Sequence, residues 1–597
     1  MSSAIRSPEP EAIPLGSLED MRGRIRRKSK LKGRQPDHVS LEEVQALIGP
    51  GPHRRDLLIE NLHKINDAWN GLHDRHLVAL SREMNVPMAE VFEVATFYHH
   101  FEILRGDEQP AALTVRVCDG LSCELAGAKD LLQRLPALLG SEVRVIAAPC
   151  VGRCEQAPVA VVGQSPVVMA KDAQVQEAAQ RHAVMHPAAA DDAAFDAGAA
   201  GPGSITASPN EIAPAYVGYD AYRAQGGYRL AAAVASGETP MDDVLKAMTD
   251  SGLRGLGGAG FPAGRKWSIV RGYAAPRVMA VNIDEGEPGT FKDRTYLERD
   301  PHRFLEGLLI AATVVGIEAC YVYLRDEYHG CRALLERELQ RLRDDPPFAL
   351  PLIELRRGAG AYICGEESAM IESIEGKRGE PRMRPPYIAQ IGLFGKPTLE
   401  HNFETLYWVR DIVQRGASWF SSYGRNGRKG LRSFSVSGRV REPGVKLAPA
   451  GISLRELVDE FCGGMLPGHD LYAYLPGGAS GGILPASMSD IPLDFDTLQP
   501  HGCFIGSAAV IVLSQHDKAR DAALNMMRFF EHESCGQCTP CRVGTGKAAT
   551  LMTAEHWDHE TLEDLNQVMI DASICGLGQA APNPVRCVQK YFPQEVA

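Results

Sequence analysis

Apolar and polar positions along this chain follow two different periods, and each period predicts a different kind of element. Between residues 39 and 110, apolar side chains recur every three or four positions, which predicts a helical segment. Ser40 and Glu43 have the spacing of a capping box, so we expect a helix to begin there. Residues 111–185 instead interleave short apolar runs with a helical stretch, which predicts a compact α/β module.

The same reasoning divides the rest of the chain. Helical spacing between Met241 and Met248 predicts a helix, and the apolar run Arg277 to Ile283 (RVMAVNI) predicts a strand. Residues 186–224 are rich in small and polar residues without an apolar period, which is typical of a linker. The expected units are a basic tail (1–38), the helical segment (39–110), the α/β module (111–185), the linker (186–224), a glycine-rich α/β domain (225–430), a β-rich module with a helix at 454–461 (431–516) and a helical C-terminal unit (517–597).

Composition narrows the classes of protein to consider. With 597 residues the chain is too long for one hydrophobic core. The net charge of −12 argues against nucleic acid as the main partner, because phosphate-binding proteins are usually basic. The chain has no long apolar run and no apolar signal-peptide core after Met1, so we expect a cytoplasmic protein with no membrane segment. In a reducing compartment, its 14 cysteines indicate metal or cluster ligation rather than disulfides.

A basic run from Arg22 to Arg34 (RGRIRRKSKLKGR) contrasts with the acidic character of the whole chain. We expect this run to be disordered, or to dock on a partner or an acidic surface. Binding of nucleic acid through the run is a further alternative, which predicts salt-sensitive binding that disappears when the tail is removed.

The glycine-rich stretch from Ser251 to Trp267 (SGLRGLGGAGFPAGRKW) is the first candidate for ligand binding. Glycine admits positive φ and lets a ligand lie against the backbone, where successive N–H groups form an anion nest. Gly255, Gly257 and Gly260 fit a dinucleotide fingerprint, but a predicted helix precedes them where that fingerprint requires a strand. An ordinary glycine-rich surface loop is the alternative, and the residues of the next strand argue against it.

Polar side chains gather at the end of the predicted strand 277–283, where an open α/β sheet places ligand-binding groups. Carboxylates cannot cradle phosphate, so we expect these side chains to face ribose hydroxyls or a flavin ring. Two further clusters follow, GAGAYICGEE at 358–367 and GEPRMRPPY…GKPTLEHNFET at 379–405. The strand-end residues are Asn282, Asp284, Glu285 and Glu287.

Two pairs of cysteines follow predicted strands of the α/β module, so its loops can bring all four thiols together. Four thiolates can hold zinc or a [2Fe–2S] cluster, and four unrelated buried thiols are the third possibility. The pairs are Cys118 with Cys123 and Cys150 with Cys154.

A third group of cysteines, in SCGQCTPCR, has the spacing of three corners of a [4Fe–4S] cluster and requires a fourth thiolate. A zinc site or an empty site is the alternative. This group is Cys535, Cys538 and Cys541. The cysteines without such grouping, which we expect to be ordinary buried thiols, are Cys320, Cys331, Cys364, Cys462 and Cys503.

Together these motifs resemble the FMN- and NADH-binding flavoprotein subunit of respiratory complex I. Subunits of this type also occur in bacterial NAD-reducing hydrogenases and NAD-dependent formate dehydrogenases. The resemblance covers about Gln225 to the C-terminus. The N-terminal part, with its cysteine pairs, is similar to the small [2Fe–2S] subunit of complex I, so two subunits are fused here.

The resemblance implies a multidomain α/β fold with four cofactor-bearing or accessory parts. These are a helical segment with a thioredoxin-like [2Fe–2S] domain, a Rossmann-like FMN/NADH domain, a ubiquitin-like β-grasp insert and a helical [4Fe–4S] domain. The implied cofactors are FMN, NAD(H), one [2Fe–2S] cluster and one [4Fe–4S] cluster. The implied metal ligands are Cys118, Cys123, Cys150, Cys154, Cys535, Cys538, Cys541 and Cys575 (in SICGLG), with Cys587 as the fallback for Cys575.

By the same resemblance, Phe261 stacks on the adenine, Glu287 lies beside the nicotinamide nucleotide and Glu367 lies near its ribose. Lys266 resembles a phosphate contact, although a surface-charge role is equally open for it. The implied cofactor-binding residues are Gly255, Gly257, Gly258, Gly260, Phe261, Lys266, Asn282, Asp284, Glu285, Glu287, Tyr362, Gly365, Glu366, Glu367, Arg384, Tyr387, Asn402 and Thr405.

The chain departs from the family pattern at three positions. Arg384 and Tyr387 replace the usual lysine and phenylalanine, and they retain the ability to bind phosphate and to stack on adenine. His401 stands where a second asparagine is common, so a flavin contact and a structural role are both open for it.

The resemblance implies a diaphorase subunit, which exchanges hydride between NAD(H) and FMN and passes single electrons through its clusters to or from a partner. Hydride transfer requires no side-chain acid or base, and Glu287 modulates nucleotide binding. All four N-terminal cysteines are present, whereas hydrogenase relatives often lack them, so we favour the β subunit of an NAD-dependent formate dehydrogenase with a molybdenum- or tungsten-containing partner. The alternatives are the diaphorase subunit of an NAD-reducing hydrogenase, a fused NADH-dehydrogenase module of complex I and, from a different class, a non-catalytic zinc-stabilised scaffold.

Overall fold

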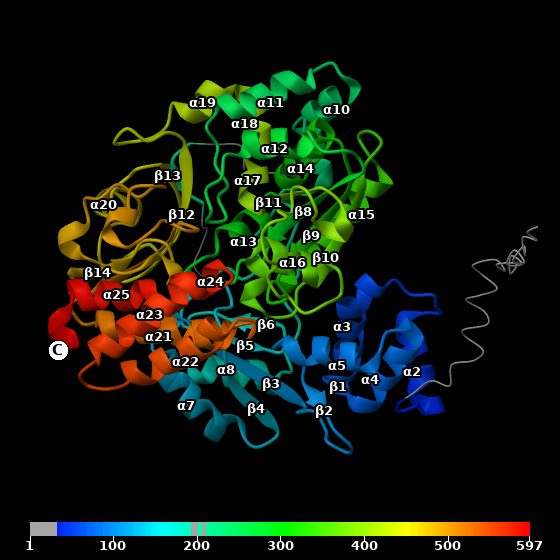
Figure 1. Cartoon of the computed structure of the whole chain (residues 1–597), viewed down its shortest axis with the longest axis horizontal. Helices are drawn as coiled ribbons and strands as arrows, with labels where there is room; N and C mark the ends of the chain where they lie inside the picture. The colour runs from blue at the N-terminus through cyan, green and yellow to red at the C-terminus, as the bar shows by residue number, and fades with distance from the viewer. Residues whose placement is uncertain (1–32, 193–200, 206–209) are drawn as a thin grey trace, which may run out of the picture.

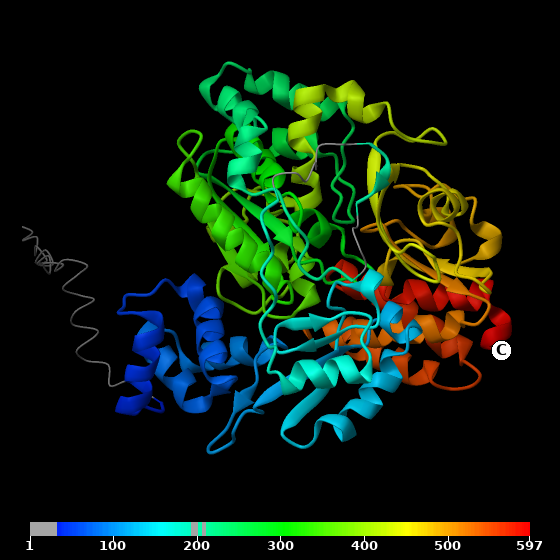
Figure 2. The same ribbon diagram turned by 180° about the vertical axis from the view of Figure 1, so that it is seen from behind.

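The computed structural model describes residues 33–192, 201–205 and 210–597 (Figure 1). Almost all of the basic run at Arg22–Arg34 lies outside these described residues, as do parts of the expected linker. The glycine-rich domain and the β-rich module lie side by side, and the C-terminal helices separate the β-rich module from the α/β module (Figures 1 and 2).

Amphipathic helices build the N-terminal segment, as the apolar spacing predicts. The expected capping box at Ser40 is wrong, because the first helix begins two residues earlier and Asp37 caps it by accepting a hydrogen bond from Ser40 N at 2.8 Å. A short parallel strand pair, β1 (Leu72–His73) and β2 (Ile103–Leu104), joins the two ends of the segment. The helices are α2 (His38–Ile48), α3 (Leu58–Trp69), α4 (Asp74–Met84) and α5 (Met88–Phe97).

The α/β module contains a four-stranded sheet in the order β4-β3-β5-β6. The first two strands in the chain are parallel and the last two run antiparallel. Its main helix packs Leu131 and Leu135 on the sheet, where both are buried. The elements are β3 (Leu113–Cys118), α6 (Leu121–Leu125), α7 (Ala128–Leu139), β4 (Val143–Ala148), β5 (Ala160–Val162), β6 (Ser165–Val167) and α8 (Asp172–Gln180).

The glycine-rich domain is organised around a parallel sheet in the order β10-β9-β8-β11. The chain adds β9 and β10 on one side of β8, and then returns to add β11 on the other side. The strands are β8 (Arg277–Ile283), which has the predicted bounds, β9 (Ile317–Leu324), β10 (Leu352–Arg357) and β11 (Thr398–Asn402). The helices are α9 (Tyr219–Ala224), α10 (Arg229–Ser236), α11 (Met241–Asp250), α12 (Ala263–Arg271), α13 (Lys292–Leu297), α14 (Pro301–Val315), α15 (His329–Asp344), α16 (Glu367–Ile374), α17 (Phe403–Tyr407), α18 (Val409–Arg415) and α19 (Ala417–Ser421).

A six-stranded mixed sheet forms the β-rich module, in the order β15-β14-β16-β12-β13-β7. Its helix α20 (Leu454–Phe461) has the predicted bounds and begins with a capping box at Ser453. The strands are β7 (Gly203–Ser204), β12 (Leu431–Gly438), β13 (Gly444–Pro449), β14 (Leu471–Leu475), β15 (Leu484–Pro485) and β16 (Ala509–Ser514).

The expected linker is more ordered than its composition predicts. Its β7 adds an edge strand to β13, and Lys446 Nζ donates to Ser204 Oγ at 3.1 Å. Backbone pairing of this kind requires no apolar period, so the hydrophobic pattern cannot reveal it.

Helices make up the C-terminal unit, as predicted, and their apolar faces share one core with the β-rich module. None of the helices in the described ranges combines the length and the apolar character needed to cross a bilayer. The C-terminal helices are α21 (Ala519–Glu533), α22 (Thr539–Met552), α23 (His559–Ala572), α24 (Gly576–Ala580) and α25 (Pro582–Tyr591).

Candidate functional site

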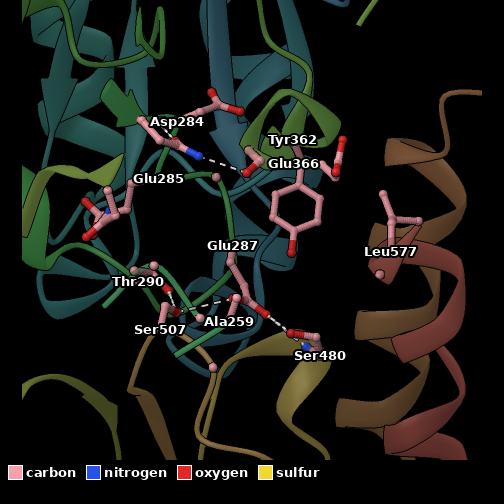
Figure 3. Close-up of a pocket in the computed structure, with 18 of the residues that line it drawn as sticks. Ala259, Asp284, Glu285, Glu287, Thr290, Tyr362, Glu366, Ser480, Ser507 and Leu577 are labelled. Carbon is pink, nitrogen blue, oxygen red and sulfur yellow. Dashed lines mark hydrogen bonds between the residues drawn. The ribbon is translucent and has the colours of Figure 1, made fainter. Parts of the chain in front are cut away.

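A pocket of about 350 Å³ opens at the carboxyl ends of β8 and β11, where the strand order of the parallel sheet reverses (Figure 3). Open α/β sheets bind ligands at such a reversal, because the loops that leave the two strands diverge there. The glycine-rich loop, the turn Tyr362–Gly365, the β-rich module and α24 supply the other walls. The sequence-predicted residues that the pocket brings together are Gly257, Gly258, Asn282, Asp284, Glu285, Glu287, Tyr362, Gly365, Glu366 and Asn402.

Asp284 lines the pocket with a carboxyl oxygen, Oδ2, that is buried and has no hydrogen-bond partner among the described residues. Its backbone N–H donates to Asn282 Oδ1 at 2.9 Å, and Asn282 Nδ2 donates to Gly365 O at 2.8 Å. Burial raises the pKa of Asp284 well above its usual range, which favours a protonated carboxyl that can donate a hydrogen bond. A ligand with its own polar atoms would satisfy this group.

Glu285 lines the same pocket, but its carboxylate is bound on the far side of the loop. It accepts hydrogen bonds from Asp293 N at 2.9 Å, Arg294 N at 3.1 Å and Tyr328 Oη at 2.8 Å. Burial, together with the nearby Asp293 carboxylate, raises the pKa of Glu285 to about 7. The side chain therefore fixes the loop that follows β8.

Glu287 reaches the opposite wall of the pocket, which the β-rich module supplies (Figure 3). Its carboxylate accepts hydrogen bonds from the backbone N–H of Ser480 at 3.0 Å, from the Ser480 hydroxyl and from Ser507 Oγ at 3.2 Å. Burial raises the pKa of Glu287, and the hydrogen bonds from Ser480 oppose that rise. The loop after β8 is thus fastened to the neighbouring module.

The glycine-rich loop approaches the sheet so closely that side chains are excluded. A Cβ atom on Gly257 would lie 2.9 Å from Asn402 Cβ, and Gly258 has a φ of +126°. Leu256 N donates to Thr405 Oγ1 at 2.9 Å, so Thr405 holds the loop without lining the pocket. The backbone of the loop is thereby exposed to a ligand.

Some predicted contacts lie outside the pocket wall, and their roles at a nucleotide remain predictions. Lys266 Nζ donates to Glu400 Oε2 at 2.9 Å, and Arg384 forms ion pairs with Glu366 and, at 2.9 Å, with Glu367. The side chain of Tyr387 is 57% exposed, so its ring is available for stacking. The residues outside the wall are Gly255, Gly260, Phe261, Lys266, Glu367, Arg384, Tyr387 and Thr405.

His401 has the structural role, not a flavin contact. Its Nε2 accepts a hydrogen bond from Trp267 Nε1 at 2.7 Å, and the side chain is buried. Burial, and to a smaller extent the Lys266 ammonium, lowers the pKa of His401 well below its usual range, so the imidazole is neutral.

Several pocket residues were not predicted from the sequence. Lys292 is buried and pairs with Asp293 at 2.6 Å and with Glu404 at 3.1 Å. The charged triplet KDR, directly after the predicted strand-end motif, was a signal that could have identified it. The distant residues that complete the pocket had no such signal, and they include Ser480, Phe504, Ser507 and Leu577.

The four N-terminal cysteines meet in the loops after β3 and β4. Cys118 contacts Cys123 and Cys150, and the sulfur atoms of Cys150 and Cys154 lie 3.3 Å apart. All four thiols are buried. Hydrogen bonds from Cys118 and Cys154 hold the pKa of Cys150 well below its usual range, which favours the thiolate form that binds metal.

The C-terminal cysteines lie where α21 gives way to α22 and where α24 begins. Cys541 interacts with Cys538 and Cys535, and Cys575 interacts with Cys535. Cys587, the fallback ligand, instead places its sulfur 3.5 Å from that of Cys503. This geometry favours Cys575 as the fourth member of the group.

No group of three or more His, Cys, Asp or Glu side chains in the described ranges is arranged around one metal ion. A cluster differs from a single ion because each thiolate of a [4Fe–4S] cluster binds its own iron. The donor sets are four sulfur atoms each, which fit iron–sulfur clusters. The pocket, with its orphaned Asp284 oxygen and exposed loop backbone, fits a flat heteroaromatic group with a polar edge.

Comparisons with known proteins agree with this geometry. Three family models match: the Nuo51 FMN-binding domain over residues 248–411, the NADH-ubiquinone oxidoreductase-F iron–sulfur binding region over 521–597 and the thioredoxin-like [2Fe–2S] ferredoxin over 44–182. An F-type NADH-quinone oxidoreductase flavoprotein of Rhizobium meliloti is 43% identical over 63% of this chain and 92% of its own length. The mitochondrial NADH dehydrogenase [ubiquinone] flavoprotein 1 of Dictyostelium discoideum is 41% identical over 60% of this chain and 78% of its own length.

A solved structure extends the similarity to the N-terminal part. One chain of an NAD⁺-reducing [NiFe]-hydrogenase in the H₂-reduced state superposes with a TM-score of 0.76 at 33% identity. The match covers 91% of this chain and 92% of that chain.

The fold and the sites define an electron-transfer flavoprotein with two iron–sulfur clusters. The chain belongs to the family of NADH-quinone oxidoreductase F-type flavoproteins, and here an N-terminal thioredoxin-like [2Fe–2S] domain is joined to it. The predicted fold class is confirmed, and so are the FMN, [2Fe–2S] and [4Fe–4S] cofactors. Formate dehydrogenase is not indicated by these comparisons.

Proposed function

We propose that this chain is the diaphorase subunit of a larger complex, in which it reacts with NAD(H) and passes single electrons to or from a partner subunit. The observation that carries the proposal is the combination, in one chain, of the pocket at the strand-order reversal with two four-cysteine groups. When FMN is bound in the pocket, it supplies hydride exchange with nicotinamide and single-electron exchange with the clusters. The protein binds, orients and shields.

The pocket residues divide these tasks. Asn402 and the backbone of Gly257 and Gly258 form the close-fitting wall, and Asp284 offers a proton on Oδ2 for a hydrogen bond to the cofactor. Glu287 keeps a carboxylate beside the nucleotide, and its charge prevents overly tight binding of the reduced form. The outer residues Phe261, Lys266, Glu367, Arg384 and Tyr387 complete the nucleotide site that the family resemblance implies.

We propose eight thiolates as cluster ligands. Cys118, Cys123, Cys150 and Cys154 hold the [2Fe–2S] cluster. Cys535, Cys538, Cys541 and Cys575 hold the [4Fe–4S] cluster, which lies next to the pocket because Leu577 follows Cys575 closely and lines it.

The partner is most consistent with a hydrogenase-type catalytic subunit. The hydrogenase chain matches both the N-terminal and the C-terminal parts of this chain, whereas the two complex I relatives described above cover only about 60% of it. A formate dehydrogenase subunit containing molybdenum or tungsten is the second candidate, supported by the complete N-terminal cysteine set.

Anaerobic purification of the intact complex tests these proposals. Reduction of NAD⁺ by hydrogen supports the hydrogenase partner, and reduction of NAD⁺ by formate supports the second candidate. If neither occurs but NADH reduces an artificial acceptor, the diaphorase role stands and both partner assignments fail. A preparation that binds FMN but never reacts with NADH contradicts the diaphorase proposal.

A further inference from the structure

The loop that carries Cys150 and Cys154 is held from outside its own module. Two of its backbone carbonyls accept hydrogen bonds from arginines of the glycine-rich domain: Cys150 O from Arg325 Nη2 at 2.7 Å and Gly152 O from Arg294 Nε at 2.9 Å. Both arginines are buried, each with 3% of its surface exposed. The neighbouring domain therefore determines where this ligand loop lies.

Tyr328 packs against the same loop. Gly152 has a φ of +71°, and a Cβ atom on it would overlap Tyr328 Oη. No side chain can stand between the loop and the tyrosine. Tyr328 Oη in turn donates to the carboxylate of Glu285, which lines the flavin pocket.

Arg325 connects the two cofactor sites directly. It follows the last residue of β9, and its backbone N–H donates to Ile283 O, at the end of β8, at 3.2 Å. While Nη2 binds Cys150 O, Nη1 donates to the backbone carbonyl of Glu285. One guanidinium thus joins the loop of a cluster ligand to the loop that forms the pocket floor.

The charge of Arg325 favours the reduced state of a cluster in this loop. Reduction adds one negative charge, and a cation held close by in buried surroundings stabilises that charge. Glu327 binds the other edge of the guanidinium at 2.7 and 3.1 Å. Removal of the arginine would therefore leave a buried carboxylate without its main partner, which penalises reduction further.

We propose that Arg325 is a positioning residue, which holds the [2Fe–2S] ligand loop against the flavin pocket and raises the reduction potential of that cluster. Arg325 acts through hydrogen bonds to two backbone carbonyls and through its charge. It ligates no iron and touches no reacting atom.

The test is a redox titration of the intact complex, followed by the electron paramagnetic resonance signal of each cluster. In Arg325→Met we expect the ratio of reduced to oxidised [2Fe–2S] cluster at a fixed potential to fall at least tenfold, a decrease in midpoint of about 59 mV for a one-electron couple. Arg325→Lys keeps the charge and lowers the midpoint less. The double variant Arg325→Met with Glu327→Gln removes both charges and recovers part of the shift.

Two controls separate this effect from a general loss of stability. Arg303, also buried, pairs with Asp411 at 2.5 Å, away from both cysteine groups, so Arg303→Met should leave both midpoints unchanged. The [4Fe–4S] midpoint, read from the same samples, should not move in Arg325→Met. Because chemical mediators set the potential, the result does not depend on NADH as substrate, which is tested separately on the wild-type complex.

An unchanged [2Fe–2S] midpoint in Arg325→Met with full iron content overturns the proposal. If that variant loses the cluster, Arg325→Lys decides: a lowered midpoint supports the proposal and an unchanged midpoint overturns it.

Discussion

At the scale of single residues, a carboxyl group without a partner is unusual inside a protein, and Asp284 places one against the pocket. Burial raises its pKa in the folded chain above the value near 4 of the unfolded chain. As the pH rises from about 4, the unfolded chain therefore loses this proton first. The stability contributed by the protonated group is present at low pH and is lost as the pH rises towards the folded pKa.

Asp284→Asn removes this titration while keeping the shape of the side chain. The variant should gain stability relative to the wild type as the pH rises, by up to about 1.4 kcal/mol per pH unit below the folded pKa. Melting temperatures of the FMN-free proteins between pH 5 and 8 measure the difference. The exposed Asp564→Asn serves as the control, and parallel pH curves for wild type and Asp284→Asn would contradict the assignment.

The choice between two cysteines also belongs to the residue scale. Cys575 interacts with Cys535, whereas Cys587 lies 3.5 Å from Cys503, away from the ligand group. Cys575→Ser should therefore lose the [4Fe–4S] signal, and Cys587→Ser should retain it. Iron content and the low-temperature resonance spectrum decide, and the opposite pattern would transfer the fourth ligand to Cys587.

At the scale of elements, the close approach of the glycine-rich loop to β11 makes a paired prediction. Gly257→Ala places a Cβ atom 2.9 Å from Asn402 Cβ, so the loop must move away from the pocket, at a cost of about 1–3 kcal/mol. A Cβ atom on Gly255 meets nothing closer than Phe261 O at 3.6 Å. We expect FMN affinity to fall at least about fivefold in Gly257→Ala and to change little in Gly255→Ala, as measured by fluorescence titration. Equal affinities in the two variants would show that the loop backbone does not face the cofactor.

Local pattern was sufficient for the elements and for one side of the site. The apolar runs predicted β8 and α20 with the observed bounds, because both elements bury side chains at a regular period. The polar residues at the end of β8 line the pocket because the sheet, and not a distant contact, places them there.

Other parts of the site depend on contacts between distant segments, which no local period records. Ser480 and Ser507 meet Glu287 only because the β-rich module docks on the loop after β8. Arg384 was expected to face a phosphate, yet it is paired with Glu366 and Glu367, residues of a different motif. The capping residue Asp37 was missed because Ser40 and Glu43 also have capping spacing, and the sequence does not show which turn comes first.

At the scale of the whole molecule, a buried arginine joins the N-terminal helices to the parallel sheet. Arg356 on β10 pairs with Asp56, with Glu60 at 3.2 Å and with Glu354 at 2.9 Å, and it is 1% exposed. Arg54 pairs with two of the same carboxylates, Asp56 and Glu354, from a side chain that is 49% exposed. The same contact thus contains one buried cation and one exposed cation.

These two arginines should contribute very differently to the docking of residues 39–110. Arg356→Met leaves carboxylates with their buried partner removed and should weaken docking by about 3 kcal/mol, because an uncompensated buried charge is costly. Arg54→Met should cost less than about 1 kcal/mol, because water screens an exposed pair. Limited proteolysis should therefore cut the helical segment faster in Arg356→Met than in Arg54→Met, while the [2Fe–2S] signal persists in both. Equal cleavage rates would mean that apolar packing, and not this ion-pair network, holds the helices on the sheet.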